Sequence, residues 1–483
     1  MKHKSFCGFF TLIALLLICS CKKSDLVVVP SSQISEKLSS IESYYVHATI
    51  RKLEALGGGQ YNYEFSFWVT TDKDSLTALE LPGDLKLTGS LITGSGNITS
   101  SFILKKGSVI SHKIMTLNEP VSVIGKFSSP GAYMGKPIYA KNTFYEQPYN
   151  LKKIHVQGTG FADSDGKSFL PWGFNYTNTD QLPLVDYDWY NDSIWEIIKQ
   201  DIREMKSMDV NIIRIHLQYN RYMTGPNTPN EDALVRLKEL VDFAAIYGLY
   251  VDITGLGCYF KVDSPVWYDA MSEEDRWATQ AVFWGAVART VNTCKNVFCY
   301  DLMNEPVTPS KKTDEWLPGE PFAGYNFVQN ITRTPNGRSW ITVTHQWISA
   351  LKPSIRLYDT ETMVTVGFIG LGIISRFNDL LDYNSAHIYP ETGKIPEAIQ
   401  FVEDNVTEKP LVIEETGPLS SGFEDMELFI TSIEPITSGI ISHFQGQTIA
   451  ELMQSNDFLD IYNRQWYRIF TQDLNPFFNK PEY

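Results

Sequence analysis

Residues 300–306 read Tyr-Asp-Leu-Met-Asn-Glu-Pro, an apolar run that stops abruptly at Glu305. About 110 residues later, residues 409–417 read Lys-Pro-Leu-Val-Ile-Glu-Glu-Thr-Gly, and this second apolar run stops at Glu414 and Glu415. A short buried strand that presents a polar side chain at its C-terminal end is typical of a (β/α)8 barrel, because the site of such a barrel is built at that end of its strands. The two stretches therefore predict a barrel in which distant carboxylates converge.

The composition indicates a folded, acidic protein. Of 483 residues, 43% are hydrophobic and 13% are aromatic, which supports a large core and excludes a disordered chain. The formal net charge is −15 and no stretch is rich in Lys or Arg, which excludes nucleic acid as a partner. An acidic exterior suits a neutral ligand. The length suits two domains, one of them large enough for a barrel.

The first residues are similar to a bacterial lipoprotein signal. Two lysines near the start precede an apolar segment at residues 9–18, which is too short to span a membrane. Residues 18–21 read Ile-Cys-Ser-Cys, which predicts cleavage after residue 20 and acylation of Cys21. Several acyl chains on one cysteine anchor a protein stably. We expect residues 1–20 to be a signal peptide and the mature protein to be a monomer anchored at the bacterial outer membrane. An ordinary secretory signal is the alternative.

The remaining cysteines and the histidines form no metal-binding or disulfide pattern. Beyond Cys21 the mature chain has Cys258, Cys294 and Cys299, whose spacing is not paired. Cys258 and Cys299 lie in or just after apolar runs, so we expect them to be small core residues. The eight histidines are scattered, and no His-Glu-x-x-His motif occurs. The sequence therefore predicts neither a metal nor a cofactor.

The composition and sequence pattern of the chain change near residue 41 and again near residue 151. Residues 21–40 are polar and Ser-rich, which is typical of a tether. Residues 41–150 contain aromatic and β-branched runs separated by Gly and Pro, which predicts a small all-β, sandwich-like domain. This domain either binds carbohydrate, for example through Trp68, or is a spacer that packs on the barrel. From residue 151 to 483, strands alternate with helices, which predicts an α/β (β/α)8 TIM barrel.

The predicted barrel has eight strand units. The expected strands are 169–174, 210–216, 249–254, 297–303, 363–368, 383–389, 411–415 and 439–444. The expected helices are 185–208, 231–247, 275–294, 338–358 and 458–471.

From residue 151 onward, the chain resembles glycoside hydrolase family 5, the cellulase family, in the wider clan of retaining (β/α)8 glycosidases. Five motifs carry the resemblance, and they occur in the family's order at predicted strand ends. They are the lead-in Gly158–Asn175, Arg214, Asn304-Glu305-Pro306, His387-Ile388-Tyr389 and Glu415-Thr416-Gly417. Each motif alone could occur by chance, but five motifs in the family's order are a specific signal.

The resemblance implies a role for each of these residues. Glu305 would be the acid/base and Glu415 the nucleophile of a retaining hydrolysis of β-glycosidic bonds. Arg214 and Tyr389 would keep Glu415 ionised, since a cation and a hydrogen bond both favour the charged carboxylate. Asn304 would hold the 2-hydroxyl of the sugar.

Glu414 competes with Glu415 for the role of nucleophile. Strand alternation is expected to place the two side chains on opposite faces of the sheet. Apolar residues precede both, so periodicity leaves the choice open. The family's Glu-x-Gly pattern favours Glu415, in which case Glu414 would face away from the cleft.

Two strand ends depart from the family pattern. The third strand offers Thr254 where the family has His, and the eighth offers His443 and Phe444 where the family has a Trp beneath the sugar. Phe444 would still stack on a sugar ring. Trp267, in the loop after the third strand, is expected to line the substrate site, and His387 is expected to support it.

These observations predict a retaining glycoside hydrolase for a polysaccharide or oligosaccharide of the β-mannan or β-glucan type. Because of the departures, we expect weak activity on crystalline cellulose. A non-catalytic, cell-surface glycan-binding lipoprotein on the same barrel is the alternative. The presence of both Glu305 and Glu415 argues against it, since a binder needs no acid/base pair.

Overall fold

The computed structural model describes residues 41–445 and 465–476, apart from short internal gaps. The gaps are 58–59, 72–78, 80, 94–95, 109, 118–123, 129–130, 141–143, 147–150, 178–183, 188, 209, 322–323 and 371–373. The predicted signal, the tether and Cys21 lie outside the described residues, as does the first half of the helix predicted at 458–471. Within the described part of the chain, no helix is both long and apolar enough to cross a membrane.

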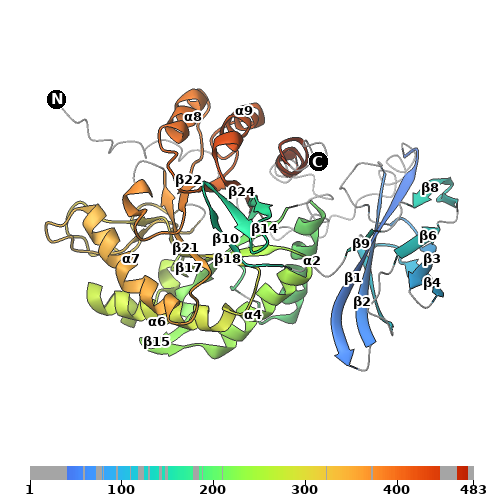
Figure 1. Ribbon diagram of the computed structural model, residues 1–483, viewed down its shortest axis with the longest axis horizontal. Coiled ribbons are helices and arrows are strands. Elements are labelled where there is room, and N and C mark those ends of the chain that lie inside the picture. The colour runs from blue at the N-terminus through green and yellow to red at the C-terminus, as the bar shows by residue number, and fades with distance from the viewer. Residues whose placement is uncertain are drawn as a thin grey trace, which may run out of the picture.

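Eight parallel strands close into a barrel, which confirms the predicted (β/α)8 architecture (Figure 1). In barrel order they are β13 (Trp172–Thr177), β14 (Ile212–Gln218), β17 (Tyr250–Gly257), β18 (Val297–Asn304), β21 (Met363–Ile369), β22 (Asn384–His387), β23 (Leu411–Thr416) and β24 (Gly439–Gln445). The order in space equals the order along the chain, so every strand ends at the same rim of the barrel.

Helices follow the strands and surround the barrel (Figure 1). The longer ones are α2 (Asp192–Ser207), α4 (Glu231–Ile246), α6 (Glu273–Val291), α7 (Trp340–Arg356), α8 (Ile395–Glu403) and α9 (Phe423–Ile433). Capping side chains fix three of the starts, because Asn230, Ser272 and Ser339 each accept a hydrogen bond from the backbone N–H three residues later.

Two helix predictions differ from the structure. The helix expected from residue 185 begins at Asp192, after a turn in which the Asn191 side chain accepts from the Ser193 N–H at 3.0 Å. Helices α8 and α9 were not predicted. They have 9 and 11 residues, too few for a helical period to stand out clearly.

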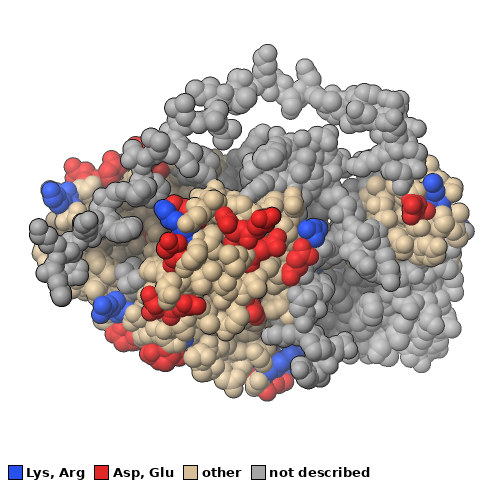
Figure 2. Space-filling view, turned by 90° about the horizontal axis from the view of Figure 1, so that it is seen from above, with Lys and Arg blue, Asp and Glu red and all other residues tan. Residues whose placement is uncertain are grey.

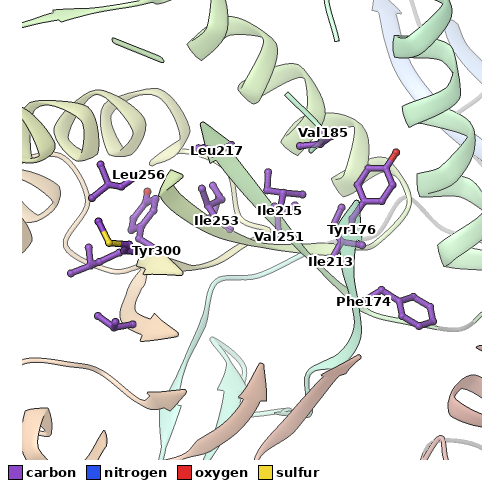
Figure 3. Close-up of a cluster of buried hydrophobic side chains, with 14 of the residues drawn as sticks. Phe174, Tyr176, Val185, Ile213, Ile215, Leu217, Val251, Ile253, Leu256 and Tyr300 are labelled. Atoms are coloured by element: carbon purple, nitrogen blue, oxygen red, sulfur yellow. The ribbon is translucent and has the colours of Figure 1, made fainter. Parts of the chain in front are cut away.

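Strand alternation separates the barrel wall into two faces. On β14, Ile213, Ile215 and Leu217 pack with the surrounding helices in the main apolar cluster, part of which is drawn in Figure 3. Arg214 and His216 occupy the opposite, inner face, where both are buried. A parallel sheet covered on both sides therefore carries its polar groups inside the barrel.

A short three-stranded sheet contributes side chains to the N-terminal end of the barrel interior. It consists of β10 (Ile154–Gln157), β11 (Gly160–Asp163) and β12 (Ser168–Phe169). Ile154 and Phe161 of this sheet join one apolar cluster with inward residues of the barrel strands, including Ile212, Phe298 and Val412. That end of the interior is therefore a packed core.

The N-terminal region is all-β, as predicted. Its strands form a sheet around β1 and β2 and a second sheet of β4, β3 and β6. The strands are β1 (Tyr44–Gly57), β2 (Gln60–Thr70), β3 (Leu85–Thr93), β4 (Gly96–Leu104), β5 (Ile110–Leu117), β6 (Ile124–Ser128), β7 (Ala132–Tyr133), β8 (Lys136–Ala140) and β9 (Phe144–Glu146). Phe65 and Phe67 of the first sheet pack on Phe102 of the second, so the two sheets share one core.

The surface is acidic, as the net charge requires. Figure 2 shows groups of Asp and Glu side chains on the described part of one face, with few Lys or Arg between them. Such a surface suits a neutral ligand better than a polyanion.

Candidate active site

Glu305 and Glu415 meet at the C-terminal rim of the barrel. Glu305 follows β18 directly, and Glu415 is the penultimate residue of β23. The His387 side chain lies between them, with Nδ1 at 2.9 Å from Oε1 of Glu305 and 3.4 Å from Oε2 of Glu415. One oxygen of each carboxylate and a ring nitrogen of His387 all lie within 4.8 Å of one another. The structure thus brings together two side chains that are 110 residues apart.

The backbone at Glu305 is strained. Its φ is +47°, in the left-handed region that residues other than glycine seldom adopt. The Glu305 N–H donates to the carbonyl of Gly367 at 2.8 Å, which holds this conformation against the next strand. Strain of this kind is concentrated at functional sites, where it aims a side chain that regular geometry would direct elsewhere.

Arg214 is the hub of the polar interior. Its guanidinium is fully buried and donates from Nη1 to Glu415 at 2.5 Å and from Nη2 to Asp301 at 2.7 Å. It also donates to Asn304 at 3.1 Å and to Asn175 at 2.8 Å. Arginine suits this place because its planar group offers several donors at fixed angles.

The charges of Arg214, His387 and the two glutamates determine which of these groups carry a proton. Burial disfavours the charged form of Glu415, but His387 and Arg214 outweigh it and lower the pKa of Glu415 to about 2. Burial likewise opposes the charged form of His387, but Glu415 and the hydrogen bond to Glu305 raise the pKa of His387 to about 10. At neutral pH, Glu415 is therefore a carboxylate and His387 an imidazolium.

Tyr389 and Asn304, the supporting residues that the resemblance implies, lie beside the two glutamates. The Tyr389 hydroxyl donates to Oε2 of Glu415 at 3.1 Å. The side-chain oxygen of Asn304 accepts from Arg214, and its amide donates to the carbonyl of Phe327 at 3.2 Å. Both residues are thus fixed next to the two glutamates.

The expected orientation of Glu414 is wrong. Ile413 and Thr416 of β23 pair with Ile440 and Ser442 of β24, so β23 has one extra residue in this interval. This β-bulge breaks the alternation, so Glu414 and Glu415 both point into the barrel instead of to opposite faces of the sheet. Its carboxylate is fully buried, where it accepts from the Tyr383 hydroxyl at 3.2 Å.

Sequence reasoning missed His216 and Asp301. His216 lies beside Arg214, with Nε2 at 3.2 Å from Nη1, and its Nδ1 lies 2.7 Å from the hydroxyl of Tyr259. Burial and the Arg214 charge hold the pKa of His216 well below its usual value, so the ring is neutral and Nε2 accepts from Arg214. Asp301 is the one charged residue in the apolar strand β18. That isolated charge is a sequence signal from which Asp301 could have been predicted.

The structure describes the side chain of only one of the two aromatic residues that were expected to contact the sugar, Trp267 and Phe444. Trp267 lies on the short helix α5 (Val266–Asp269), half-buried, with its ring next to Tyr219 and Tyr268. Packing therefore accounts for its position. Phe444 lies on β24 and pairs with Tyr176, but its side chain is outside the described part of the structure.

Two groups of side chains have spacing that a metal ion could use. One is Glu305, His387 and Glu415, and the other is Asp252, Cys299 and Glu414. In the first group the raised pKa of His387 keeps a proton on the ring, which competes with metal binding. This group is better described as two carboxylates bridged by an imidazolium.

A cavity of about 420 Å³ lies beside the loop that follows Glu305. Residues 306–310 form one wall, and Arg338, half-buried Trp340 and Phe368 contribute to the others. A concave site with an aromatic wall suits a sugar ring.

Comparison with known proteins gives a family match for part of the barrel. Residues 162–366 match the family model described as Cellulase (glycosyl hydrolase family 5). The match includes Arg214, Asn304 and Glu305 and ends before His387 and Glu415. No curated protein sequence matches the chain.

The chain is similar to several solved structures at low sequence identity. A β-glucanase from Saccharophagus degradans is 18% identical, with 67% of this chain and 93% of that chain covered and a TM-score of 0.48. A β-1,4-mannanase from the sea hare Aplysia kurodai is 14% identical, with 63% and 98% covered and a TM-score of 0.47. An exo-β-1,4-mannosidase from Opitutaceae bacterium strain TAV5 is 15% identical, with 65% and 61% covered and a TM-score of 0.48. Residues 162–366 thus carry a match to the cellulase family, glycosyl hydrolase family 5, and the protein is a glycoside hydrolase.

Proposed function

We propose that the protein is a retaining β-glycosidase in which Glu415 is the nucleophile and Glu305 the acid/base. One observation carries the proposal: an oxygen of Glu305 and an oxygen of Glu415 lie within 4.8 Å of each other. Retaining enzymes have carboxyl groups roughly 5–5.5 Å apart, whereas inverting enzymes need roughly 6.5–9.5 Å to place a water between them. The spacing supports direct attack by Glu415.

The surrounding contacts suit two displacements. In the first, Glu415 forms a bond to the anomeric carbon while the glycosidic bond breaks and Glu305 gives its proton to the leaving oxygen. In the second, Glu305 takes a proton from water, and the water oxygen displaces Glu415. Arg214 and Tyr389 contact Glu415 from two sides, which holds the carboxylate in the orientation for attack.

The substrate that we propose is a soluble polysaccharide or oligosaccharide of the β-mannan or β-glucan type. The residues that directly follow Glu305, the acid in this proposal, line the cavity, so we assign the cavity to the sugar unit that leaves. Trp340 in its wall offers a face on which a sugar ring can stack. Strand ends without the family's His and Trp support a substrate other than crystalline cellulose.

The test is the stereochemistry of the first product. Soluble β-mannans, β-glucans and aryl β-glycosides would be incubated with the protein, and the anomeric proton signals followed by NMR before mutarotation. We expect the β-anomer to appear first. An initial α-anomer would exclude the double displacement. Binding of a glycan without any release of sugar would instead support the non-catalytic alternative.

We also propose that the mature chain is anchored through an acylated Cys21. The motif at residues 18–21 supports this proposal. A Cys21→Ser variant is expected to lose lipid labelling and to move from the membrane fraction to the soluble fraction. Unchanged labelling and fractionation would refute the anchor.

A further inference from the structure

A second pair of acidic side chains lies deeper in the barrel, beneath the two glutamates at the rim. Asp252 of β17 and Glu414 of β23 are both fully buried. One oxygen of each, together with Sγ of Cys299, lies within a group whose atoms are no more than 4.8 Å apart. This pair has no part in the two displacements described above.

The two carboxyl groups differ in their partners. Glu414 accepts from the hydroxyls of Tyr383 and Ser385, and its Oε2 lies 3.8 Å from Nε of Arg214. Neither oxygen of Asp252 has a hydrogen-bond donor among the described residues. A buried carboxylate without a donor is costly, and two buried carboxylates side by side cannot both remain ionised. A proton on Asp252, donated to Glu414, removes both costs.

We propose that Asp252 is a neutral carboxylic acid that donates a hydrogen bond to Glu414, and that this pair is a positioning device for Arg214 and His387. Glu414 holds the pair's negative charge. Its Oε2 lies 3.8 Å from Arg214 and 3.9 Å from Nε2 of His387, the nitrogen that faces away from the two glutamates at the rim. Both cations that contact Glu415 are therefore also held from below.

The charges of the interior agree with this assignment. Glu414, Asp301 and Glu415 as carboxylates already outnumber the two cations Arg214 and His387, so an ionised Asp252 would add a further unbalanced charge. Burial and the Glu414 charge raise the pKa of Asp252 well above its usual value. Burial opposes ionisation of Glu414, but the positive charges of Arg214 and His387 lower the pKa of Glu414 to about 2.

Polar and ionisable groups face this pair from most of the strands that surround it. They are Asn175 on β13, Arg214 on β14, Cys299 and Asp301 on β18, Tyr383 before β22, Ser385 and His387 on β22, and Glu415 on β23. Gly367 of β21 leaves room for them. A Cβ there would lie 2.6 Å from His387 Nε2 and 3.0 Å from both Arg214 Nη2 and Glu414 Oε2.

Infrared difference spectroscopy tests the proton without reference to catalysis. The spectrum of the native protein minus that of Asp252→Asn at pH 7 is expected to contain the carbonyl stretch of a protonated carboxylic acid. Its absence, with only carboxylate bands lost, would overturn the assignment even if the proposed glycosidase activity is correct. A stoichiometric divalent metal in the purified protein that Asp252→Asn no longer holds would overturn it as well.

Three variants test the positioning role, which rests on the proposed function. Asp252→Asn keeps a donor toward Glu414 and is expected to retain activity, whereas Asp252→Ala, which removes the donor, should lower kcat by about tenfold. Glu414→Gln keeps the shape but removes the charge next to His387. The histidine should then lose its proton at a lower pH, so the basic limb of the kcat profile should move down by about one pH unit.

A purely structural role predicts a different pattern. It would lower the melting temperature of all three variants without moving the pH profile. An unmoved profile in folded Glu414→Gln, or loss of activity in folded Asp252→Asn equal to that of Asp252→Ala, would overturn the positioning role. If Glu414→Gln does not fold, the comparison of the two Asp252 variants still decides.

Discussion

The same barrel strands carry apolar side chains at one end of the barrel interior and charged side chains at the other. At the N-terminal end the inward positions are apolar, and two residues further along three of the strands they are charged. The steps are Ile212 to Arg214 on β14, Tyr250 to Asp252 on β17, and Val412 to Glu414 on β23. One period of strand alternation therefore separates a packed core from a polar network.

The two ends are stabilised by different forces. Burial of apolar side chains at the N-terminal end contributes roughly 25 cal/mol per Å² of area removed from water. At the C-terminal end, attraction between Arg214 and its carboxylates is offset by the cost of taking those charges out of water, so the net contribution to stability is small. The contrast predicts that variants at one end change stability and variants at the other change catalysis.

The largest effect is expected for Glu415→Ala. Without the nucleophile the covalent route is lost, so kcat should fall by about four orders of magnitude or more while the fold persists. The measurement is hydrolysis of an aryl β-glycoside, with and without azide. A small anion fits the space left by the carboxylate and should restore turnover with inverted configuration. If Glu414→Ala abolishes activity and Glu415→Ala does not, the assignment of the nucleophile is off by one residue.

A second, smaller loss is expected for Gly367→Ala. The added methyl group would lie 2.6 Å from Nε2 of His387, a distance that real contacts do not reach, so the ring must move. A shift of this size next to the reacting groups should lower kcat by about 10²-fold. The control is Gly285→Ala on α6, where the nearest neighbour of an added Cβ is 3.5 Å away, and its activity should be close to native. Equal kcat in the two variants would show that the network tolerates displacement.

The barrel and the rim site were predictable because both depend on strand ends. A parallel barrel brings every strand end to one rim, so motifs far apart in the sequence must converge there. Arg214, Glu305, His387, Tyr389 and Glu415 do so in the structure. No knowledge of the loops was needed for this.

The deeper network could not be predicted from alternation alone. Its contacts depend on bulges, and the one between Ile413 and Thr416 places Glu414 and Glu415 on the same face, where alternation implies opposite faces. A second irregularity lies between Asp301 and Asn304, where β18 has one residue more than β21, so both residues contact Arg214. A bulge depends on pairing with neighbouring strands, which the order of residues in one strand does not specify.

The other end of the interior should respond in the opposite way. Ile212→Ala removes a fully buried side chain two residues from Arg214 and should lower the free energy of unfolding by about 2–5 kcal/mol. The kcat of the protein that remains folded should be close to native, because the polar network is untouched. Denaturant unfolding and activity measured on the same samples check this. A fall in kcat comparable to that of Gly367→Ala would mean that the two ends are coupled.

The smallest effect is expected outside the barrel interior, at Trp340. If the cavity beside residues 306–310 receives the leaving sugar unit, Trp340→Ala removes a stacking surface there. A contact of about 0.5–1.5 kcal/mol corresponds to a several-fold increase in KM for a polysaccharide, with kcat little changed. An aryl glycoside whose leaving group is too small to reach Trp340 should be hydrolysed as before. The matched control is Trp195→Ala on α2, a half-buried tryptophan that stacks with Arg236 and does not line the cavity. An equal rise in KM for both substrates, or for both variants, would show that Trp340 contributes only to packing, and the leaving sugar would then have to bind elsewhere on the rim.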